Sequence, residues 1–171
     1  MNKSYCKMPF VGFQATHRGH RICCASKNVT SDSINDFWHS DYIKNVRSKM
    51  LKGEYVKECT SCYQSEEQGQ ISLRNHYNNR YKDFSENNLP TALDLDFSNL
   101  CNLKCIMCGP DRSSMWAKEK NLFKESKGVT NIKQEWLDEI CELSHDLKYL
   151  TIQGGEPTLI DEYLSLIHIS E

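Results

Sequence analysis

The sequence predicts an α/β protein whose main element is a parallel strand–helix–strand unit. The first observation is an alternation of apolar and polar residues over 91–98, which is the pattern of a strand. The second is an apolar stripe at helical spacing over 133–144. The third is another apolar strand, 147–153, closed by Gly154 and Gly155. Strand, helix and strand in this order favour parallel pairing with a right-handed crossover.

A smaller, cysteine-rich α+β segment precedes this unit. Residues 11–16 are predicted to form a short strand, and a turn at 17–20 leads into a second strand that ends at Cys23. His17 and His20 flank this turn, so we expect both at the surface. Residues 34–51 have the apolar spacing of one helix. The asparagine-rich stretch 75–88 is predicted to end a helix and continue as a linker, which separates domains 1–88 and 89–163.

The composition is that of an ordinary globular chain. Of its 171 residues, 39% are hydrophobic and 26% are charged, which argues against a membrane span and against wholesale disorder. The formal charge of −2 offers no broad basic surface for a nucleic acid. The first residues contain no apolar run that would direct export, so we expect a cytoplasmic protein with reduced thiols. The nine cysteines, an odd number, then point to metal ligation rather than to disulfides.

Three cysteines lie in one tight run directly after the first strand of the parallel unit. Cys101, Cys105 and Cys108 are separated by gaps of three and two residues, so one loop presents three thiolates. Thiolates bind iron–sulfur clusters, and a [4Fe–4S] cube held by three of them keeps one iron corner open. Two alternatives stay open: a zinc site, and a cluster that takes a fourth cysteine from elsewhere in the chain.

The cysteine run resembles the hallmark of the radical S-adenosylmethionine superfamily, in which a hydrophobic or aromatic residue precedes the last cysteine. Met107 has that place here. A second match follows the next predicted strand, at Gly154, Gly155, Glu156 and Pro157. In the family, this segment lines the pocket for the methionine amino group of S-adenosylmethionine. Met107 would contact the adenine through its backbone.

The resemblance implies a fold, a reaction and its partners. The fold would be the N-terminal part of a partial (β/α)6 barrel, truncated after about two βα units. Cys101, Cys105 and Cys108 would hold a [4Fe–4S] cluster, whose electron cleaves S-adenosylmethionine to a 5′-deoxyadenosyl radical that abstracts hydrogen from a substrate. A low-potential electron donor of the flavodoxin or ferredoxin type is implied, and a peptide is our first candidate for the unknown substrate. A non-catalytic iron–sulfur electron carrier and a zinc-binding interaction module stay as alternatives.

The N-terminal segment carries a second group of cysteines. Cys59 and Cys62 form a two-thiol knuckle of the kind that binds zinc or an iron–sulfur cluster. Cys6 and one of Cys23 and Cys24 are expected to complete the set, because neighbouring residues of a strand point to opposite faces. The stretch 6–24 is similar to the opening of SPASM and twitch auxiliary-cluster modules, whose spacing implies Cys24 as the ligand. The resemblance therefore implies a twitch-like domain with an auxiliary [4Fe–4S] cluster, with structural zinc as the alternative.

Two further stretches carry expectations about structure. Residues 164–171 resemble a translated adapter read-through, so we expect a non-native tail; the alternative is that they extend a helix starting near Leu159. The chain would then be a fragment that is inactive by itself. Arg74, Arg80 and Lys82 are expected to form a solvated basic face.

Overall fold

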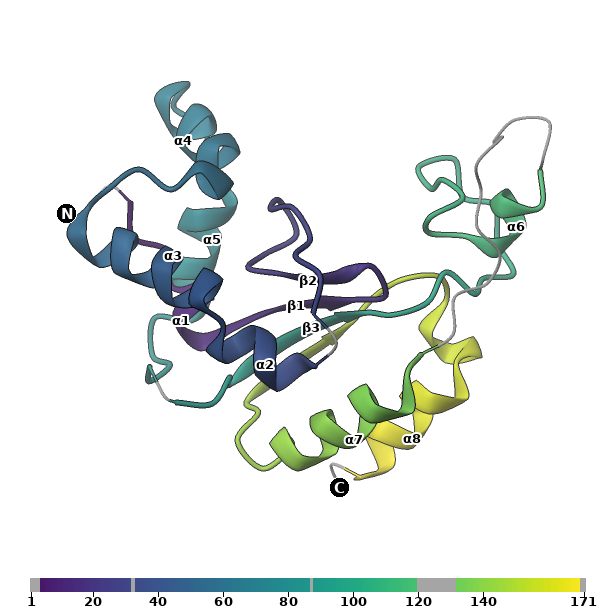
Figure 1. The fold of residues 1–171 in the computed structure, drawn as a ribbon. Coiled ribbons are helices and arrows are strands. Elements are labelled where there is room, and N and C mark those ends of the chain that lie inside the picture. Colours follow the sequence, from purple (N-terminus) through teal and green to yellow (C-terminus); the bar gives the residue numbers. More distant parts are fainter. Residues whose placement is uncertain (1–3, 32, 87, 120–131, 170–171) are drawn as a thin grey trace.

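The protein has an open, mixed four-stranded sheet with helices packed on both of its faces (Figure 1). The computed structural model describes residues 4–31, 33–86, 88–119 and 132–169. The strands are β1 (Gly12–Thr16), β2 (Gly19–Arg21), β3 (Ala92–Asp96) and β4 (Tyr149–Ile152), in the order β2-β1-β3-β4. β1 pairs antiparallel with β2 and parallel with β3, and β3 pairs parallel with β4. The predicted α/β class and the parallel pairing of the last two strands are therefore confirmed.

The helices of the described residues are short. They are α1 (Met8–Val11), α2 (Ile34–His39), α3 (Asp41–Lys52), η1 (Lys57–Cys59), α4 (Thr60–Glu67), α5 (Leu73–Arg80), α6 (Ser114–Ala117), α7 (Gln134–Leu143), η2 (Pro157–Leu159) and α8 (Asp161–Ile169). The helix predicted over 133–144 is confirmed by α7. Within these described ranges, no helix has both the length and the apolar character needed to cross a membrane.

One face of the sheet is apolar and holds most of the core. Phe13 of β1 and Leu93 of β3 are neighbours in the parallel register, and both are fully buried. Helices α2, α7 and α8 cover this face. Phe13 lies 5.0 Å from Phe37 of α2 between ring centroids, and Phe97, just after β3, contacts rings of both α7 and α8.

The opposite face of the sheet is polar and is also largely covered. Gln14, Asp94 and Thr151 lie in register across β1, β3 and β4. Helix α5 packs over this side, where the ring of Tyr81 lies 5.9 Å from that of Tyr149. Burial raises the pKa of Asp94 above its usual value. β3 is therefore buried on both faces, as is usual for a central parallel strand.

The parallel pairing of β1 with β3 joins the two halves of the chain. Gly12 permits this pairing, because a Cβ at that position would lie 1.8 Å from the carbonyl oxygen of Ala92. The core contains residues from both sides of the boundary predicted between 88 and 89. The segments 1–88 and 89–163 thus share one sheet and one core. The local sequence pattern of β1 does not predict its pairing with β3, because the pattern of a strand does not specify which other strand it pairs with.

Two local predictions in the N-terminal segment are wrong. Residues 34–51 form two helices, because Ser40 is extended and its hydroxyl accepts a hydrogen bond from the backbone nitrogen of Ile43 at 3.3 Å, which caps α3. His20 is fully buried rather than at the surface. It pairs with Ala15 across β1 and β2, so its ring points to the apolar face and contacts aromatic rings of α2 and α7.

The C-terminal helix α8 includes most of the segment predicted to be a non-native tail. Its residues Tyr163 and Leu166 are buried in the core, with 1% and 6% of their surfaces exposed. The helix expected to start near Leu159 is thus present as α8, and the non-native origin of residues 164–171 stays a prediction. Residues 170–171 of the predicted tail lie outside the described ranges.

Candidate metal and cofactor site

The two predicted motifs meet at the edge of the sheet where β3 and β4 end. These strands are parallel, so their carboxyl ends lie side by side. Just beyond them, the backbone nitrogen of Gln153 donates a hydrogen bond of 2.7 Å to the carbonyl oxygen of Leu95. The backbone nitrogen of Glu156 donates another, also 2.7 Å, to the carbonyl oxygen of Leu100. Since Leu100 precedes Cys101, the glycine-rich turn is bonded directly to the segment that leads into the cysteine run.

Both glycines of this turn are required by its geometry. Gly154 and Gly155 have φ angles of 89° and 50°, a region that side chains other than glycine rarely adopt. A Cβ at Gly154 would lie 2.4 Å from Oδ1 of Asp96, and one at Gly155 would lie 2.0 Å from the carbonyl oxygen of Leu100. The close approach of the two backbone segments therefore depends on the absence of side chains at both positions.

Glu156 and Pro157 complete the turn and start η2. Oε1 of Glu156 accepts hydrogen bonds from the backbone nitrogen and the hydroxyl of Thr158, at 3.3 and 2.8 Å. Pro157 occupies the first helical position, where its missing N–H costs nothing. The carboxylate of Glu156 thus caps its own helix in this structure.

The cysteine run forms a loop whose base is held by the start of α6. The hydroxyl of Ser113 donates a hydrogen bond to the carbonyl oxygen of Leu103 at 2.6 Å. The hydroxyl of Ser114 donates to the carbonyl oxygen of Cys101 at 3.0 Å. Ser113 also caps α6 by accepting from the backbone nitrogen of Trp116. The short helix therefore fixes the first part of the loop.

The tip of this loop is apolar and faces solvent. Ile106 is 97% exposed and Met107 is 89% exposed. Cys105 is also exposed, whereas Cys101 and Cys108 are half-buried. The thiols and the residue predicted to contact the adenine are thus accessible to a ligand.

The chemistry of these donors fits an iron–sulfur cluster, because three soft thiols stand on one accessible loop. Their arrangement is not a preformed cage. Among the described residues, no group of three or more His, Cys, Asp or Glu side chains is positioned to hold a metal ion. Binding a cluster would therefore require the loop to gather its thiols, and metal binding commonly orders its ligands in this way.

A second group of thiols surrounds a small cavity in the N-terminal segment. Cys6, Cys23, Cys59 and Cys62 all line this cavity, whose volume is about 10 Å³. Cys6 precedes α1, Cys23 follows β2, and the other two lie on η1 and α4, so separate parts of the chain meet here. All four cysteines are buried. The structure thus brings together three predicted ligands, Cys6, Cys59 and Cys62, with Cys23 in place of Cys24, although the four thiols form no ready metal cage.

Of the two adjacent cysteines, Cys23 and not Cys24 lines this cavity. Cys24 is exposed, and its sulfur lies 3.7 Å from the hydroxyl oxygen of Tyr77. The reason is a tight turn after β2, in which the hydroxyl of Ser26 donates to the carbonyl oxygen of Cys23 at 2.9 Å. This turn places the side chain of Cys23 in the cavity wall and that of Cys24 at the protein surface.

Burial keeps the thiols of Cys6, Cys23 and Cys59 protonated. It raises the pKa of Cys23 to about 11 and that of Cys59 to about 12, and it raises the pKa of Cys6 further still. Neighbouring thiols add to each rise, because adjacent negative charges repel. A metal that binds here must therefore displace protons, so its affinity should increase with pH.

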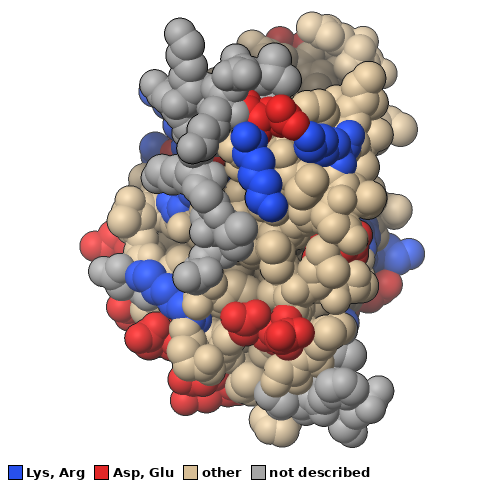
Figure 2. Space-filling model, turned by 90° about the vertical axis from the view of Figure 1, so that its right-hand side faces the viewer, with Lys and Arg blue, Asp and Glu red and all other residues tan. Residues whose placement is uncertain are grey.

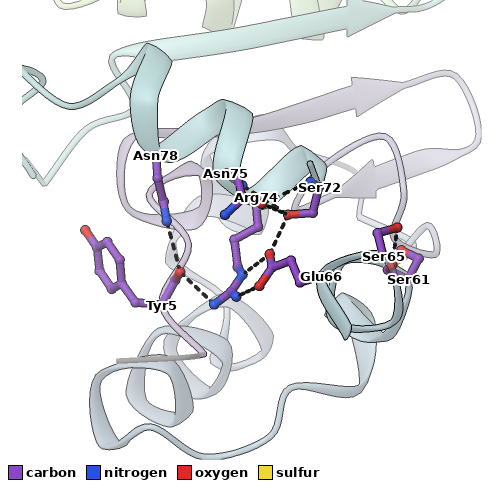
Figure 3. A network of polar contacts seen from close by, with 8 residues as sticks. All are labelled: Tyr5, Ser61, Ser65, Glu66, Ser72, Arg74, Asn75 and Asn78. Atoms are coloured by element: carbon purple, nitrogen blue, oxygen red, sulfur yellow. Dashed lines mark hydrogen bonds and ion pairs between the residues drawn. The ribbon is translucent and has the colours of Figure 1, made fainter. Parts of the chain in front are cut away.

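Arg74 lines the same cavity. Its side chain lies at the centre of a network of polar contacts (Figure 3). Its Nε donates to Oε1 of Glu66 at 2.9 Å, and Nη2 forms an ion pair with Oε2. Nη1 donates to the carbonyl oxygen of Tyr5, next to Cys6, at 3.4 Å. The network thus joins the N-terminal segment, α4 and α5 around the thiols.

The prediction of a solvated face is wrong for Arg74, which is only 8% exposed. Its charge is balanced by Glu66, and the hydrogen bonds from Arg74 hold the pKa of that carboxyl below its usual value. Sequence reasoning missed this pair because Glu66 and Arg74 lie on different helices, where no helical spacing rule connects them.

Comparison with protein-family models, with curated proteins and with solved structures finds no match to this chain. The function is therefore argued from the residues and their positions.

Proposed function

We propose that this chain forms the cluster- and cofactor-binding part of a radical S-adenosylmethionine enzyme. The observation that carries the proposal is the juxtaposition of the cysteine run and the Gly-Gly-Glu-Pro turn, joined by the hydrogen bond from Glu156 to Leu100. The two motifs follow neighbouring parallel strands, and α/β folds bind ligands at the carboxyl ends of such strands. Alone, the cysteine run could be a zinc site and the Gly-Gly-Glu-Pro segment an ordinary turn. Together at one sheet edge, they suit a cofactor that binds both a metal and the protein backbone.

Each part of the site has a role in this proposal. Cys101, Cys105 and Cys108 would hold three irons of a [4Fe–4S] cluster and leave the fourth for S-adenosylmethionine. When bound, the cluster would supply the electron that cleaves this cofactor to methionine and a 5′-deoxyadenosyl radical. The chain itself provides placement. Gly154 and Gly155 leave the backbone of the turn free of side chains, and the exposed loop tip leaves Met107 available to the adenine.

We also propose that Cys6, Cys23, Cys59 and Cys62 hold a second metal centre. Four thiolates complete the ligand set of either an auxiliary [4Fe–4S] cluster or a structural zinc ion. The four thiols must close around either metal, because they form no ready metal cage in this structure. Either metal would stabilise a segment whose helices are short.

For the complete enzyme, we propose a peptide as the first candidate substrate and a low-potential flavodoxin- or ferredoxin-type protein as the electron donor. We also propose a cytoplasmic location. All nine cysteines are free thiols, and a reducing compartment would keep them so.

The test is anaerobic reconstitution of the full chain with iron and sulfide, followed by iron counting and electron paramagnetic resonance of the reduced protein. We expect a [4Fe–4S] signal that changes when S-adenosylmethionine is added, because the cofactor binds the open iron. Cys105→Ala should remove the part of the signal that responds to S-adenosylmethionine, whereas the signal of an auxiliary cluster would remain. Cys141→Ala, which changes a cysteine outside both groups, should retain the response.

Two results would contradict the proposal. Cluster signals of which none responds to S-adenosylmethionine would favour the electron carrier, whose cluster has four protein ligands. A chain that binds zinc and takes up no iron would favour the interaction module.

A further inference from the structure

A second, larger cavity lies at the carboxyl ends of β1 and β3, beside the cysteine loop. Its volume is about 350 Å³, which is within the usual range for small-molecule sites. The side chains that line it are mostly charged or polar and come from the β1–β2 turn, the end of β3, the loop after β2 and the segment after Cys108: Thr16, His17, Arg18, Arg21, Asn28, Asp96, Gly109, Asp111 and Arg112. This lining differs from that of the cysteine cavity, which is lined mainly by thiols and apolar groups.

Arginine outnumbers aspartate around this cavity, with three side chains against two. Arg18 Nη1 donates to Asp111 at 3.2 Å, and Arg112 Nη1 donates to Asp96 at 2.6 Å. Arg21 has no carboxylate partner in the described part of the chain; its Nε donates to the amide oxygen of Gln14 at 2.7 Å. Figure 2 looks onto this side of the molecule, where basic and acidic side chains lie next to one another.

These contacts hold the arginines without using all of their donors. A guanidinium has five N–H groups, and each arginine of the cavity gives only one or two of them to the partners named here. Their remaining N–H groups suit the paired oxygens of a carboxylate or phosphate. The ion pairs of Arg18 and Arg112 thus orient two guanidinium groups, and Arg21 keeps its charge uncompensated.

The turn that carries His17 and Arg18 is held firmly against β3. The backbone nitrogen of His17 donates to the carbonyl oxygen of Asp96 at 3.1 Å. Nε2 of His17 accepts a hydrogen bond from Nε of Arg18 at 3.1 Å, which requires an unprotonated Nε2. Burial lowers the pKa of His17, so the ring is neutral at neutral pH and adds no positive charge of its own.

A glycine fixes the other end of this turn. Gly19 has a φ angle of 114°, and a Cβ there would lie 2.5 Å from the carbonyl oxygen of Val29. The loop that carries Asn28 is thereby packed against the turn, and backbone hydrogen bonds between His20 and Val29 secure it. The cavity walls are therefore preorganised, which lowers the entropic cost of binding.

We propose that this cavity binds an oxyanion, the carboxylate or phosphate group of a small molecule. Three guanidinium groups from separate segments surround one space. Arg18 and Arg112 are paired with Asp111 and Asp96, and Arg21 has no carboxylate partner in the described residues. Gly109 lies in the lining directly after Cys108, so a ligand held here would reach the cysteine loop. That this ligand is the enzyme's substrate rests on the proposed function, whereas anion binding itself does not.

The experiment uses the full chain without metal or S-adenosylmethionine, at neutral pH and low salt. Inorganic phosphate and acetate are titrated separately and followed by nuclear magnetic resonance of the backbone amides. We expect saturable shifts in the residues that line the cavity. Arg21→Gln should weaken binding about tenfold, because it removes a charge-assisted contact. Arg80→Gln, which removes an exposed arginine outside the cavity, should change the affinity by less than about twofold.

Tighter binding of phosphate than of acetate would identify a phosphate site, and the reverse a carboxylate site. The proposal is overturned if neither anion saturates, or if Arg21→Gln and Arg80→Gln weaken binding equally, since that result indicates a general charge effect. Should Arg21→Gln fail to fold, Arg18→Gln replaces it, because the side chain of Arg18 is 45% exposed. The absence of metal and cofactor separates this outcome from any failure of the radical chemistry.

Discussion

The backbone nitrogen of Glu156 donates a hydrogen bond to the carbonyl oxygen of Leu100, and this bond joins the turn after β4 to the residue before Cys101. Only backbone atoms take part, so the bond depends on how closely two chain segments approach. Gly154 and Gly155 allow that approach. Changes at these glycines should therefore act on the cysteine loop even though neither is a metal ligand.

The first prediction concerns Gly155→Ala. The new Cβ would meet the carbonyl oxygen of Leu100, so we expect the free energy of unfolding to fall by about 3 kcal/mol. Gly69→Ala is the matched control, since Gly69 also has a positive φ but has open space around its Cβ position. It should cost about 1 kcal/mol. Urea denaturation measures both, and equal losses would show that the contact with Leu100 is unimportant.

The second prediction separates the two adjacent cysteines. Cys23→Ser should abolish metal binding at the N-terminal cavity, because Cys23 lines it, whereas Cys24→Ser should retain the metal. Zinc and iron per chain are measured by mass spectrometry after anaerobic loading of each variant. If Cys24→Ser loses the metal and Cys23→Ser retains it, Cys24 is the ligand, as the family spacing implied.

The third prediction is a loss of stability in acid caused by His20. Burial, together with the nearby positive charge of Lys133, lowers the pKa of His20 from 6.5 to about 4. The unfolded chain therefore takes up a proton on this ring first as the pH falls. The stabilisation is complete above pH 6.5 and is lost as the pH falls toward 4, by about 3 kcal/mol in all.

His20→Phe keeps an aromatic ring at this position and removes the titration. Denaturation midpoints at neutral pH and at about pH 4 should differ less for the variant than for the natural chain. Acidic groups elsewhere contribute equally to both proteins. The difference between their two changes in midpoint therefore comes from His20. If stability varies with pH equally in both proteins, folding does not change the pKa of His20 and the prediction is wrong.

The fourth prediction concerns the ion pair beside the thiols. Arg74→Gln leaves the Glu66 carboxylate without its charged partner in a mostly buried setting, with the Ser72 hydroxyl still donating to it, so the free energy of unfolding should fall by about 3 kcal/mol. Arg80→Gln, at an exposed site on the same helix, should cost less than about 1 kcal/mol. Calorimetry of both variants checks this, and similar melting temperatures would mean that the network adds little.

Much of the fold follows from local pattern. The alternation over 91–98 and the apolar stripe over 133–144 predict β3 and α7. In each element, the apolar residues recur with the spacing that brings them to one buried face. The pairing of β1 with β3 does not follow, since it depends on Gly12 meeting the backbone of Ala92 across a long stretch of chain. Ser40 likewise divides a helix that apolar spacing alone would continue.

In the candidate site too, local sequence pattern predicts some features, and tertiary contacts determine the others. Spacing singles out Cys101, Cys105 and Cys108, and strand order places them beside Gly154 and Gly155. The choice between Cys23 and Cys24 depends on a turn after β2, which is a tertiary feature. The cavity lined by Arg18, Arg21 and Arg112 could not be predicted from the sequence either, because its residues come from segments far apart in the chain.

The pairing of β1 with β3 also affects folding during synthesis. The ribosome releases β1 and β2 long before Ala92–Asp96 emerges, so the nascent chain must carry a hairpin whose second neighbour does not yet exist. By then Cys6, Cys23, Cys59 and Cys62 have all been made. A metal captured at the proposed site at that stage would hold the hairpin in place until its partner strand arrives, and metal supply would then affect the yield of folded protein.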